Sequence, residues 1–236
     1  MIPKKIHYCW FGKNPLPADV KKCIESWKKC CPDYEIIEWN ESNFDITQNP
    51  FMKAAYENKA WAFVSDYARL KVVYDNGGIY LDTDVELLKS LDTLLDNPCY
   101  LAIQQRGRLV NTGLGFGAEK GSVMIQKMLE EYENNAFSLE KRDALACPNL
   151  NSKSVRELCG EYALDEITSF EDVKVFPPQY FDPYAPGDAK NLLNDDTYSI
   201  HHYSASWTSN KQKFKRKIVR LIGQDRIYKI KQRMHK

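Results

Sequence analysis

The clearest candidates for chemistry in this sequence are two aspartates that stand one residue apart. Asp82 and Asp84 directly follow the apolar segment 79–81, which is itself preceded by two glycines. On a regular strand, residues two positions apart share a face, so both carboxylates are expected to point the same way. Carboxylate oxygens suit Mg²⁺ or Mn²⁺, and such a cation can in turn bind a diphosphate. A surface turn capped by aspartate is the alternative, because turns favour the same residue type.

Two adjacent histidines near the end of the sequence are the second set of candidate metal ligands. His201 and His202 lie in the segment 197–203, whose composition predicts a strand. A neutral imidazole beside two carboxylates is a reasonable ligand set for Mn²⁺. Because neighbouring strand residues point to opposite faces, only one of the two histidines is expected to reach the metal.

A third pair of charged residues lies in the segment 62–75, whose apolar spacing predicts a helix. Asp66 and Arg69 are three positions apart, so they share one helix face and are able to act on the same ligand. A surface ion pair, worth about 0–1 kcal/mol, is the alternative for this pair. The helix is expected to stop at residues 76–78, where two glycines allow the left-handed conformation that ends helices.

The elements that must position these residues alternate between strand and helix. The expected strands of the first half are 5–11, 34–39 and 79–81, and the expected helices are 17–29, one beginning at Asn49-Pro50, and 62–75. This alternation predicts an α/β fold with a mixed, mainly parallel central sheet. The second half is expected to hold a strand at 100–104, a helix at 122–134, loops over 134–155, an extended loop at 176–188 and a last strand at 197–203.

The composition is that of a soluble globular protein. The chain has 236 residues, of which 43% are hydrophobic and 28% charged, values that exclude intrinsic disorder for most of its length. A chain of this size holds a core without disulfides. The seven cysteines contain no C-x-x-C pair and no zinc-ligand spacing, which indicates reduced thiols in a cytoplasm. Neither a signal peptide nor an 18-residue apolar stretch is found.

The net charge of +1 conceals a strongly basic end. Residues 211–236 hold 11 basic residues and one acid, which leaves 22 basic and 31 acidic residues in 1–210. An acidic body of this kind is not typical of nucleic-acid binding, so no nucleic-acid partner is expected. The basic segment has apolar residues at helical spacing, which predicts an amphipathic helix on an anionic membrane surface. Packing of that helix on the body is the alternative. We therefore expect a domain over 1–210, a tail over 211–236, and a peripheral location at the inner face of the plasma membrane.

Three ordered blocks resemble glycosyltransferase family 32. Residues 61–88 look like the DXD-motif sugar-transfer domain of that family, with the sequence WAFVSDYARLKVVYDNGGIYLDTDVELL. Residues 2–12 (IPKKIHYCWFG) match its first strand, and residues 200–203 followed by 206–207 resemble its C-terminal His…Ser-Trp element. The family includes yeast initiating mannosyltransferases and bacterial capsule and lipopolysaccharide transferases. It is similar to the glucosylating domain of the large clostridial toxins.

The resemblance implies a GT-A fold, a nucleotide-sugar donor, a divalent metal that is usually Mn²⁺, and retention of the anomeric configuration. It also implies roles for the residues that match its motif. Asp84 would bind the metal directly and Asp82 would lie near the ribose and the sugar. Asp66 and Arg69 would contact the sugar and phosphate of the donor. Of the two histidines, the family pattern favours His201 as the ligand, and the other is then structural.

Further donor contacts follow from the same resemblance. The donor-binding residues that it adds are Tyr8, Trp10, Tyr80, Asn111, Ser206 and Trp207. Trp10 would flank the nucleotide base, with a place in the apolar core as the alternative. Asn111 opens a glycine-rich segment, 111–117, that would approach the sugar, with a simple hairpin as the alternative. Ser206 and Trp207 would close over the diphosphate.

The sequence thus predicts a metal-dependent retaining glycosyltransferase. It would move a hexose from a nucleotide sugar, UDP being preferred over GDP, to a saccharide or lipid-linked saccharide acceptor in surface polysaccharide or lipopolysaccharide synthesis. Front-face displacement is the expected mechanism, because no carboxylate can be named as a covalent nucleophile. A haloacid-dehalogenase-type phosphatase, which also carries an Asp-x-Asp motif, is one alternative. A glycan- or nucleotide-binding module without turnover is the other.

Overall fold

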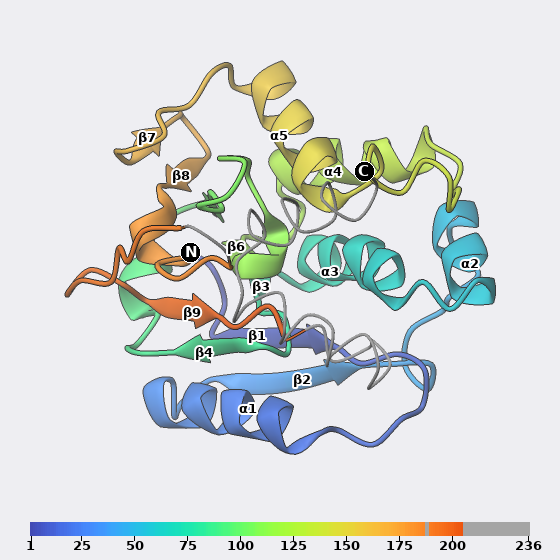
Figure 1. The fold of residues 1–236 in the computed structure, drawn as a ribbon, viewed down its shortest axis with the longest axis horizontal. Coiled ribbons are helices and arrows are strands. Elements are labelled where there is room, and N and C mark those ends of the chain that lie inside the picture. The colour runs from blue at the N-terminus through green and yellow to red at the C-terminus, as the bar shows by residue number, and fades with distance from the viewer. Residues whose placement is uncertain (187–188, 205–236) are drawn as a thin grey trace, which may run out of the picture.

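The computed structural model describes residues 1–186 and 189–204. Within these residues, the centre of the fold is a seven-stranded sheet in the order β2-β1-β3-β6-β5-β8-β7, and β4 and β9 form a separate two-stranded ribbon (Figure 1). The strands are β1 (Lys5–Cys9), β2 (Glu35–Trp39), β3 (Gly78–Tyr80), β4 (Val85–Leu87), β5 (Cys99–Ala102), β6 (Phe116–Ala118), β7 (Thr168–Ser169), β8 (Lys174–Phe176) and β9 (Ser199–His201). The helices are α1 (Ala18–Cys30), α2 (Pro50–Glu57), α3 (Trp61–Asn76), α4 (Val123–Glu133) and α5 (Cys147–Leu158), with short 3-10 turns η1 (Asp92–Leu94), η2 (Thr112–Leu114) and η3 (Pro178–Tyr180).

The expected mixed α/β sheet is confirmed. Strand β1 runs parallel to β2 and β3, and β5 runs parallel to β8. Strand β6 runs antiparallel to β3 and β5, and β7 runs antiparallel to β8. Because His7 of β1 pairs with Tyr80 of β3, the carboxyl ends of these two parallel strands lie side by side. This is the edge at which α/β sheets bind ligands.

Side chains of the central strands alternate between two apolar cores. In β1, Tyr8 packs into the core covered by α1, whereas Cys9 packs into the core covered by α2, α3, α4 and α5. In β3, Ile79 and Tyr80 divide between the same two cores. Figure 1 shows α1 at the bottom, beyond β2, and α2 to α5 on the other side of β1 and β2. Complete burial of such side chains contributes about 1.5–3 kcal/mol each, so both faces hold the sheet edge in place.

The helix that carries the predicted charged pair has the termini that the sequence indicates. Helix α3 ends at Asn76, and Gly77 follows it with φ 64°, in the left-handed region that glycine adopts most easily. The carbonyl of Gly77 lies 2.8 Å from Nε2 of His7, which joins the helix end to β1. The helix before it starts as expected too, because the Asn49 side chain accepts a hydrogen bond from the backbone N–H of Met52 at 3.0 Å.

The expectation of a loop-rich segment over 134–155 is right up to residue 146 and wrong beyond it, because α5 occupies Cys147–Leu158. The buried face of this helix includes the polar residues Asn151 and Ser152, so the apolar spacing that reveals other helices is weak here. Both side chains bind the backbone at the start of η2: Ser152 accepts from the N–H of Val110, two residues before it, at 2.8 Å, and Asn151 accepts from the N–H of Thr112, its first residue, at 3.3 Å. Helix α5 therefore supports the segment that faces the site described below.

The predicted basic amphipathic helix and the domain boundary at residue 210 lie outside the described residues. Among the residues that the structure describes, none of the helices has the length and apolar character needed to cross a membrane.

Candidate active site

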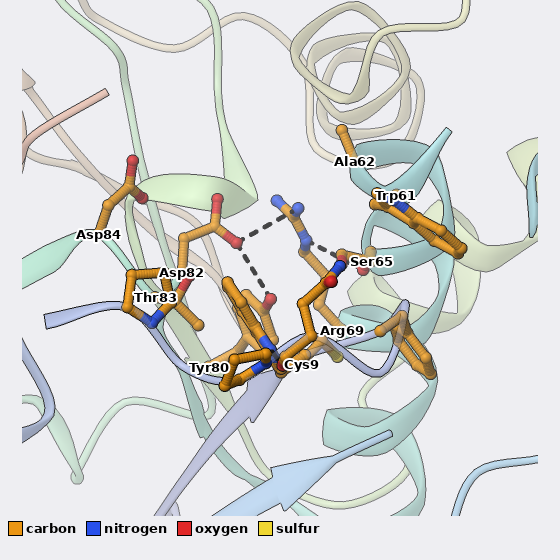
Figure 2. A pocket seen from close by; sticks show the side chains of 14 residues that line it. Cys9, Trp61, Ala62, Ser65, Arg69, Tyr80, Asp82, Thr83 and Asp84 are labelled. Carbon is orange, nitrogen blue, oxygen red and sulfur yellow. Dashed lines mark hydrogen bonds and ion pairs between the residues drawn. The ribbon is translucent and has the colours of Figure 1, made fainter. Parts of the chain in front are cut away.

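A pocket of about 410 Å³ opens at the carboxyl ends of β1 and β3. Its volume falls in the range of small-molecule sites. Figure 2 shows carboxylates at one end of this pocket and Trp61 at the other, with Arg69 and Tyr80 between them. The lining residues are Cys9, Trp10, Phe11, Asn14, Pro15, Pro17, Trp61, Ala62, Ser65, Arg69, Tyr80, Asp82, Thr83 and Asp84.

Arg69 lies between two carboxylates at the floor of the pocket. Its Nη2 is 2.8 Å from Oδ1 of Asp66 and 3.3 Å from Oδ1 of Asp82. The hydroxyl of Tyr80 donates to the same Asp82 oxygen at 3.0 Å, and the Tyr80 ring centroid is 5.2 Å from the guanidinium carbon. The Arg69 and Asp66 side chains are 4% and 8% exposed. The pair is therefore buried, and the alternative of a surface ion pair is excluded.

Burial and charge act against each other in this group. Burial raises the pKa of Asp66 to about 6, although the neighbouring Arg69 opposes that rise. Burial also raises the pKa of Asp82, again against the attraction of Arg69. For Arg69, the effect of the two carboxylates exceeds that of burial, so its pKa rises and the guanidinium stays charged. A fixed positive charge at the pocket floor is suited to binding a negatively charged ligand.

Asp82, Asp84 and His201 form a candidate metal site. One ligand atom of each lies within 4.8 Å of the others, and Nε2 of His201 is 3.0 Å from Oδ1 of Asp84. Burial alone would raise the pKa of Asp84. The charge and hydrogen bond of His201, with the backbone N–H and hydroxyl of Ser204, outweigh it and hold that pKa well below its usual range. Two carboxylates and one imidazole are a donor set that fits Mn²⁺ or Mg²⁺.

The two aspartates come together through a turn, which the sequence offered as the alternative to a strand, although this turn is buried and not at the surface. Strand β3 ends at Tyr80, and residues 83–84 form a turn before β4 rather than a continued strand. The carboxylates therefore converge through this turn, not through the alternation of a regular strand. Asp84 is 5% exposed and its Oδ2 accepts from Ser204 N–H at 2.8 Å, so it also anchors the segment that follows β9.

Strand alternation does separate the two histidines. Strand β9 pairs antiparallel with β4, and His201 lies opposite Val85. His201 is 8% exposed and turns towards Asp84. His202 points away, and its Nε2 lies 2.8 Å from Oε2 of Glu86. The structure thus brings His201 into the cluster and leaves His202 outside it.

Asn111 lies behind the pocket rather than on its wall. Its Oδ1 accepts from the Gly113 N–H at 2.8 Å and from the Cys147 thiol at 3.4 Å, and Nη1 of Arg69 lies 3.9 Å from that sulfur. A Cβ added at Gly113 would meet Oδ2 of Asp82 at 2.6 Å. The glycine-rich segment therefore forms the 3-10 turn η2, which contacts the Arg69–Asp82 pair closely instead of making a simple hairpin.

The remaining predicted donor residues divide into three groups. Trp10 and Tyr80 line the pocket, and the Trp10 indole N–H donates to the backbone oxygen of Asn14 at 2.6 Å. Tyr8 lies in the other core, donates to Glu38 at 2.7 Å and does not line the pocket, which argues against direct donor contact. Ser206 and Trp207 lie outside the described residues.

Four further residues of this site were not predicted from the sequence. Trp61 and Ser65 line the pocket from α3, on the same side of the helix as Arg69, so their spacing of four was the available clue. Ser204 and Cys147 reach the site from segments distant in sequence, and only the fold brings them there.

Comparison with known proteins agrees with this geometry. Residues 17–101 match the model of the glycosyltransferase sugar-binding region containing the DXD motif. An inositol phosphoceramide mannosyltransferase of Schizosaccharomyces pombe is 30% identical over 144 residues, covering 58% of this chain and 39% of that protein. The chain thus spans only about two-fifths of that relative. An uncharacterized glycosyltransferase of Acanthamoeba polyphaga mimivirus is 25% identical over 222 residues, which cover 88% of this chain and 84% of that protein.

Among solved structures, PaToxG glycosyltransferase superposes with a TM-score of 0.52 at 21% identity, covering 66% of this chain and 69% of that one. The chain has the GT-A type of α/β fold, and its residues 17–101 are similar to the sugar-binding region of DXD-containing glycosyltransferases. More particularly, its first half carries the DXD-containing sugar-binding region, and the resemblance to glycosyltransferase family 32 drawn from the sequence is confirmed in that region.

Proposed function

We propose that this protein transfers a hexose from a nucleotide sugar to a saccharide or lipid-linked saccharide acceptor, with retention of configuration. The observation that carries the proposal is the Asp82–Asp84–His201 cluster at the end of a pocket of about 410 Å³. UDP is the nucleotide that we favour over GDP, and Mn²⁺ the cation, with Mg²⁺ as its substitute. Surface polysaccharide or lipopolysaccharide synthesis is the process that would use such a transfer.

The proposal is supported by side chains in the pocket that suit the diphosphate, the base and the sugar of a donor. The metal ligands would be Asp84, Asp82 and His201, and a divalent cation there supplies positive charge to a bound diphosphate. Trp10 offers an aromatic face for the base, a contact worth roughly 1–3 kcal/mol in nucleic-acid systems. Arg69, whose guanidinium is held by Asp66 and Asp82, lies where it can bind the sugar or a phosphate oxygen.

The same geometry favours front-face displacement. The carboxylates that line the pocket are Asp82 and Asp84; the first binds Arg69 and Tyr80, and the second binds His201 and Ser204. Neither is free to attack the anomeric carbon. In the proposed reaction, the acceptor oxygen forms the new glycosidic bond as the bond to the diphosphate breaks, and its proton passes to a donor phosphate oxygen. Arg69 stabilises the negative charge that develops on the leaving group.

The family match argues against the phosphatase alternative, since the matched region is a sugar-binding one. A binding module without turnover would have the same pocket, so only a reaction assay separates it from an enzyme.

The test is a screen of UDP- and GDP-sugars for hydrolysis in the presence of Mn²⁺, Mg²⁺ or EDTA, with release of the nucleoside diphosphate as the readout. We expect slow, metal-dependent hydrolysis of at least one donor, faster when a saccharide acceptor is added. The anomeric configuration of the product, read by NMR, tests retention. Binding of a donor without any release would favour the module, and release of phosphate from p-nitrophenyl phosphate alone would favour the phosphatase.

We also propose that the basic segment 211–236 holds the enzyme at the inner face of the plasma membrane, where lipid-linked acceptors are presented. This proposal rests on the 11 basic residues of that segment.

A further inference from the structure

Two buried polar atoms beside the metal cluster have no hydrogen-bond partner among the described residues. They are Nδ1 of His201 and Oδ1 of Asp182. His201 is 8% exposed and Asp182 is 0% exposed. An unsatisfied buried polar group costs about 1–3 kcal/mol, so a pair of them requires an explanation.

Asp182 and His201 both contact Tyr203. The Tyr203 hydroxyl donates to Oδ2 of Asp182 at 2.8 Å, and the centroid of its ring is 4.1 Å from that of His201, edge to face. Tyr203 also has φ 50°, in the left-handed region that side chains other than glycine rarely adopt. Such strain costs about 1–3 kcal/mol and persists only where neighbouring contacts enforce it. The contacts of Tyr203 with these two residues are of that kind.

The Asp182 carboxylate is held rigidly through one of its two oxygens. Oδ2 accepts from the backbone N–H of Gln105 at 2.7 Å as well as from Tyr203. The Gln105 side chain in turn donates to the carbonyls of Pro183 at 3.3 Å and Lys190 at 2.9 Å. These bonds fix the position of Asp182 and leave the lone pairs of Oδ1 available as acceptors.

The metal site imposes a demand on His201 that Asp182 is able to meet. His201 faces Asp84 with Nε2, so Nε2 is the atom that would bind a cation, and the ring proton must then reside on Nδ1. A histidine that binds a metal usually donates its other ring N–H to a carboxylate, a carbonyl or a water. Within residues 1–186 and 189–204, Nδ1 of His201 has no acceptor and Oδ1 of Asp182 has no donor.

We propose that Asp182 is a positioning residue for the metal ligand His201, and that Oδ1 of Asp182 accepts the Nδ1 proton of His201 through one bridging water. The water is required because no direct hydrogen bond joins the two atoms. Ser199, two residues before His201 on the same face of β9, also has a buried hydroxyl with no partner among the described residues, so it is a further candidate to bind this water. The inference rests on the proposed function, since it takes His201 as a metal ligand.

The first experiment compares Mn²⁺ affinity in the full chain and in Asp182→Asn. The amide oxygen of asparagine keeps the hydrogen bonds from Gln105 and Tyr203, but its NH₂ group removes the acceptor that orients the water. We expect the Kd for Mn²⁺, measured from the EPR signal of free Mn²⁺, to rise about 10–100-fold. The matched control is Glu86→Gln, which alters a carboxylate on β4 whose Oε2 lies 2.8 Å from Nε2 of His202. That variant should bind Mn²⁺ within about twofold of wild type.

A double-mutant cycle then separates positioning from a general structural role. If Asp182 acts through His201, Asp182→Asn should change the Kd less than about twofold when His201→Ala is already present. If the increases in Kd caused by the two single substitutions multiply in the double variant, the residues act independently and the inference is overturned. Tyr203→Phe is the second variant, in case Asp182→Asn does not fold. It keeps the Asp182 carboxylate but removes one hydroxyl that donates to it. We expect its Kd for Mn²⁺ to rise as well, by less than in Asp182→Asn.

The two proposals fail in different ways. A wild-type protein that binds no Mn²⁺ would refute the metal site, and this inference with it. A wild-type protein that binds Mn²⁺ while Asp182→Asn binds it equally well would overturn this inference and leave the proposed function standing.

Discussion

The charged residues of the pocket are buried and contact specific polar or charged partners instead of water. Arg69 lies between two carboxylates. Asp84 contacts His201 and accepts hydrogen bonds from the backbone N–H and the hydroxyl of Ser204. Removing one member of a buried ion pair typically costs 3–5 kcal/mol, because the other charge stays buried without compensation. Substitutions at this site must therefore preserve shape and hydrogen bonding if loss of catalysis is to be distinguished from loss of folding.

The first prediction concerns Asp84→Asn. The amide oxygen still accepts from Ser204, so the fold should survive, whereas the ligand charge at the proposed metal site is lost. We expect metal-dependent donor hydrolysis to fall at least about 10³-fold, because the contribution of the metal to the transition state is several kcal/mol. Steady-state rates at saturating Mn²⁺ provide the measurement, and circular dichroism provides the folding control. A variant that keeps more than about a tenth of the wild-type rate would disprove the role of Asp84 as a metal ligand.

The second prediction distinguishes the two histidines. His201→Ala should raise the Mn²⁺ concentration that gives half-maximal activity at least about tenfold, since it removes the imidazole of the cluster. His202→Ala should leave that concentration unchanged within about twofold, because His202 pairs with Glu86 on the other face of β9. Metal titrations of the two purified variants provide the comparison. Equal behaviour, or a larger effect at His202, would show that the cluster is assigned to the wrong residue.

At the scale of elements, the site depends on how closely the turn η2 approaches the end of β3. A Cβ at Gly113 would stand 2.6 Å from Oδ2 of Asp82 and 3.1 Å from Nη1 of Arg69, and both side chains are already held by other bonds. Gly113→Ala should therefore displace the pair and reduce kcat/KM for the donor about 10–100-fold, by misplacing groups that contact it.

The control for this prediction is Gly121→Ala, at a glycine with φ 76° and no atom within 4 Å of the added Cβ. Its backbone strain lowers stability, but the activity of the folded protein should not change. Thermal melting together with kcat/KM separates the two effects. If both variants retain wild-type kcat/KM, the close approach of η2 has no functional consequence.

The junction between α3 and β1 predicts a pH dependence of stability. Burial lowers the pKa of His7, whose Nε2–H faces the Gly77 carbonyl at 2.8 Å while Nδ1 accepts from the Trp39 indole at 3.1 Å. The folded state thus keeps His7 neutral, and the unfolded chain binds a proton below about pH 6.5. Stability from this group is present above that pH and is lost as pH falls, by at most about 1.4 kcal/mol per pH unit.

Urea unfolding of wild type and His7→Gln at pH 7.5, 6.5 and 5.5 measures this effect. The His7→Gln variant should be less stable than wild type at all three pH values, but glutamine does not titrate. The difference in the free energy of unfolding between the two proteins should therefore shrink as pH falls. The comparison is needed because the pKa of His201 is raised by Asp84 and acts in the opposite direction. A difference that is constant over the three pH values would contradict the neutral state of His7.

The accuracy of sequence-based prediction also differs between elements. Helix α3 and its stop at Gly77 were predictable, because apolar spacing and a glycine with φ 64° reflect local physics. The cap of α2 by Asn49 is local in the same way. Helix α5 was not predicted, since its buried face carries Asn151 and Ser152 and gains its stability from bonds to a distant segment. Local periodicity carries no information about such partners.

For the molecule as a whole, the resemblance of short motifs predicted more than their spacing did. His201 was predicted to join Asp82 and Asp84 although more than a hundred residues separate it from them, and the fold brings one ligand atom of each within 4.8 Å of the others. Tyr8 was predicted to contact the donor from the first-strand block 2–12, but alternation along β1 places its side chain in the other core. The role of Asp182 had no sequence signal, because it depends on bonds from Gln105 and Tyr203.

The distribution of charge over the whole chain leads to the last prediction. The segment 211–236 lies outside the described residues, but its 11 basic residues stand against a body with an excess of acids. Each basic residue near an anionic surface contributes about 1 kcal/mol. Replacing Lys213, Lys215, Arg216 and Lys217 by glutamine should thus weaken the affinity for phosphatidylglycerol vesicles, measured by co-sedimentation, on the order of a thousandfold. The matched control replaces Lys21, Lys22, Lys28 and Lys29 of α1, and should bind as wild type does.

Wild-type binding should also fall between 50 and about 500 mM salt, where charges are screened. Equal binding by the two variants, or binding that ignores salt, would mean that the segment is not an electrostatic anchor.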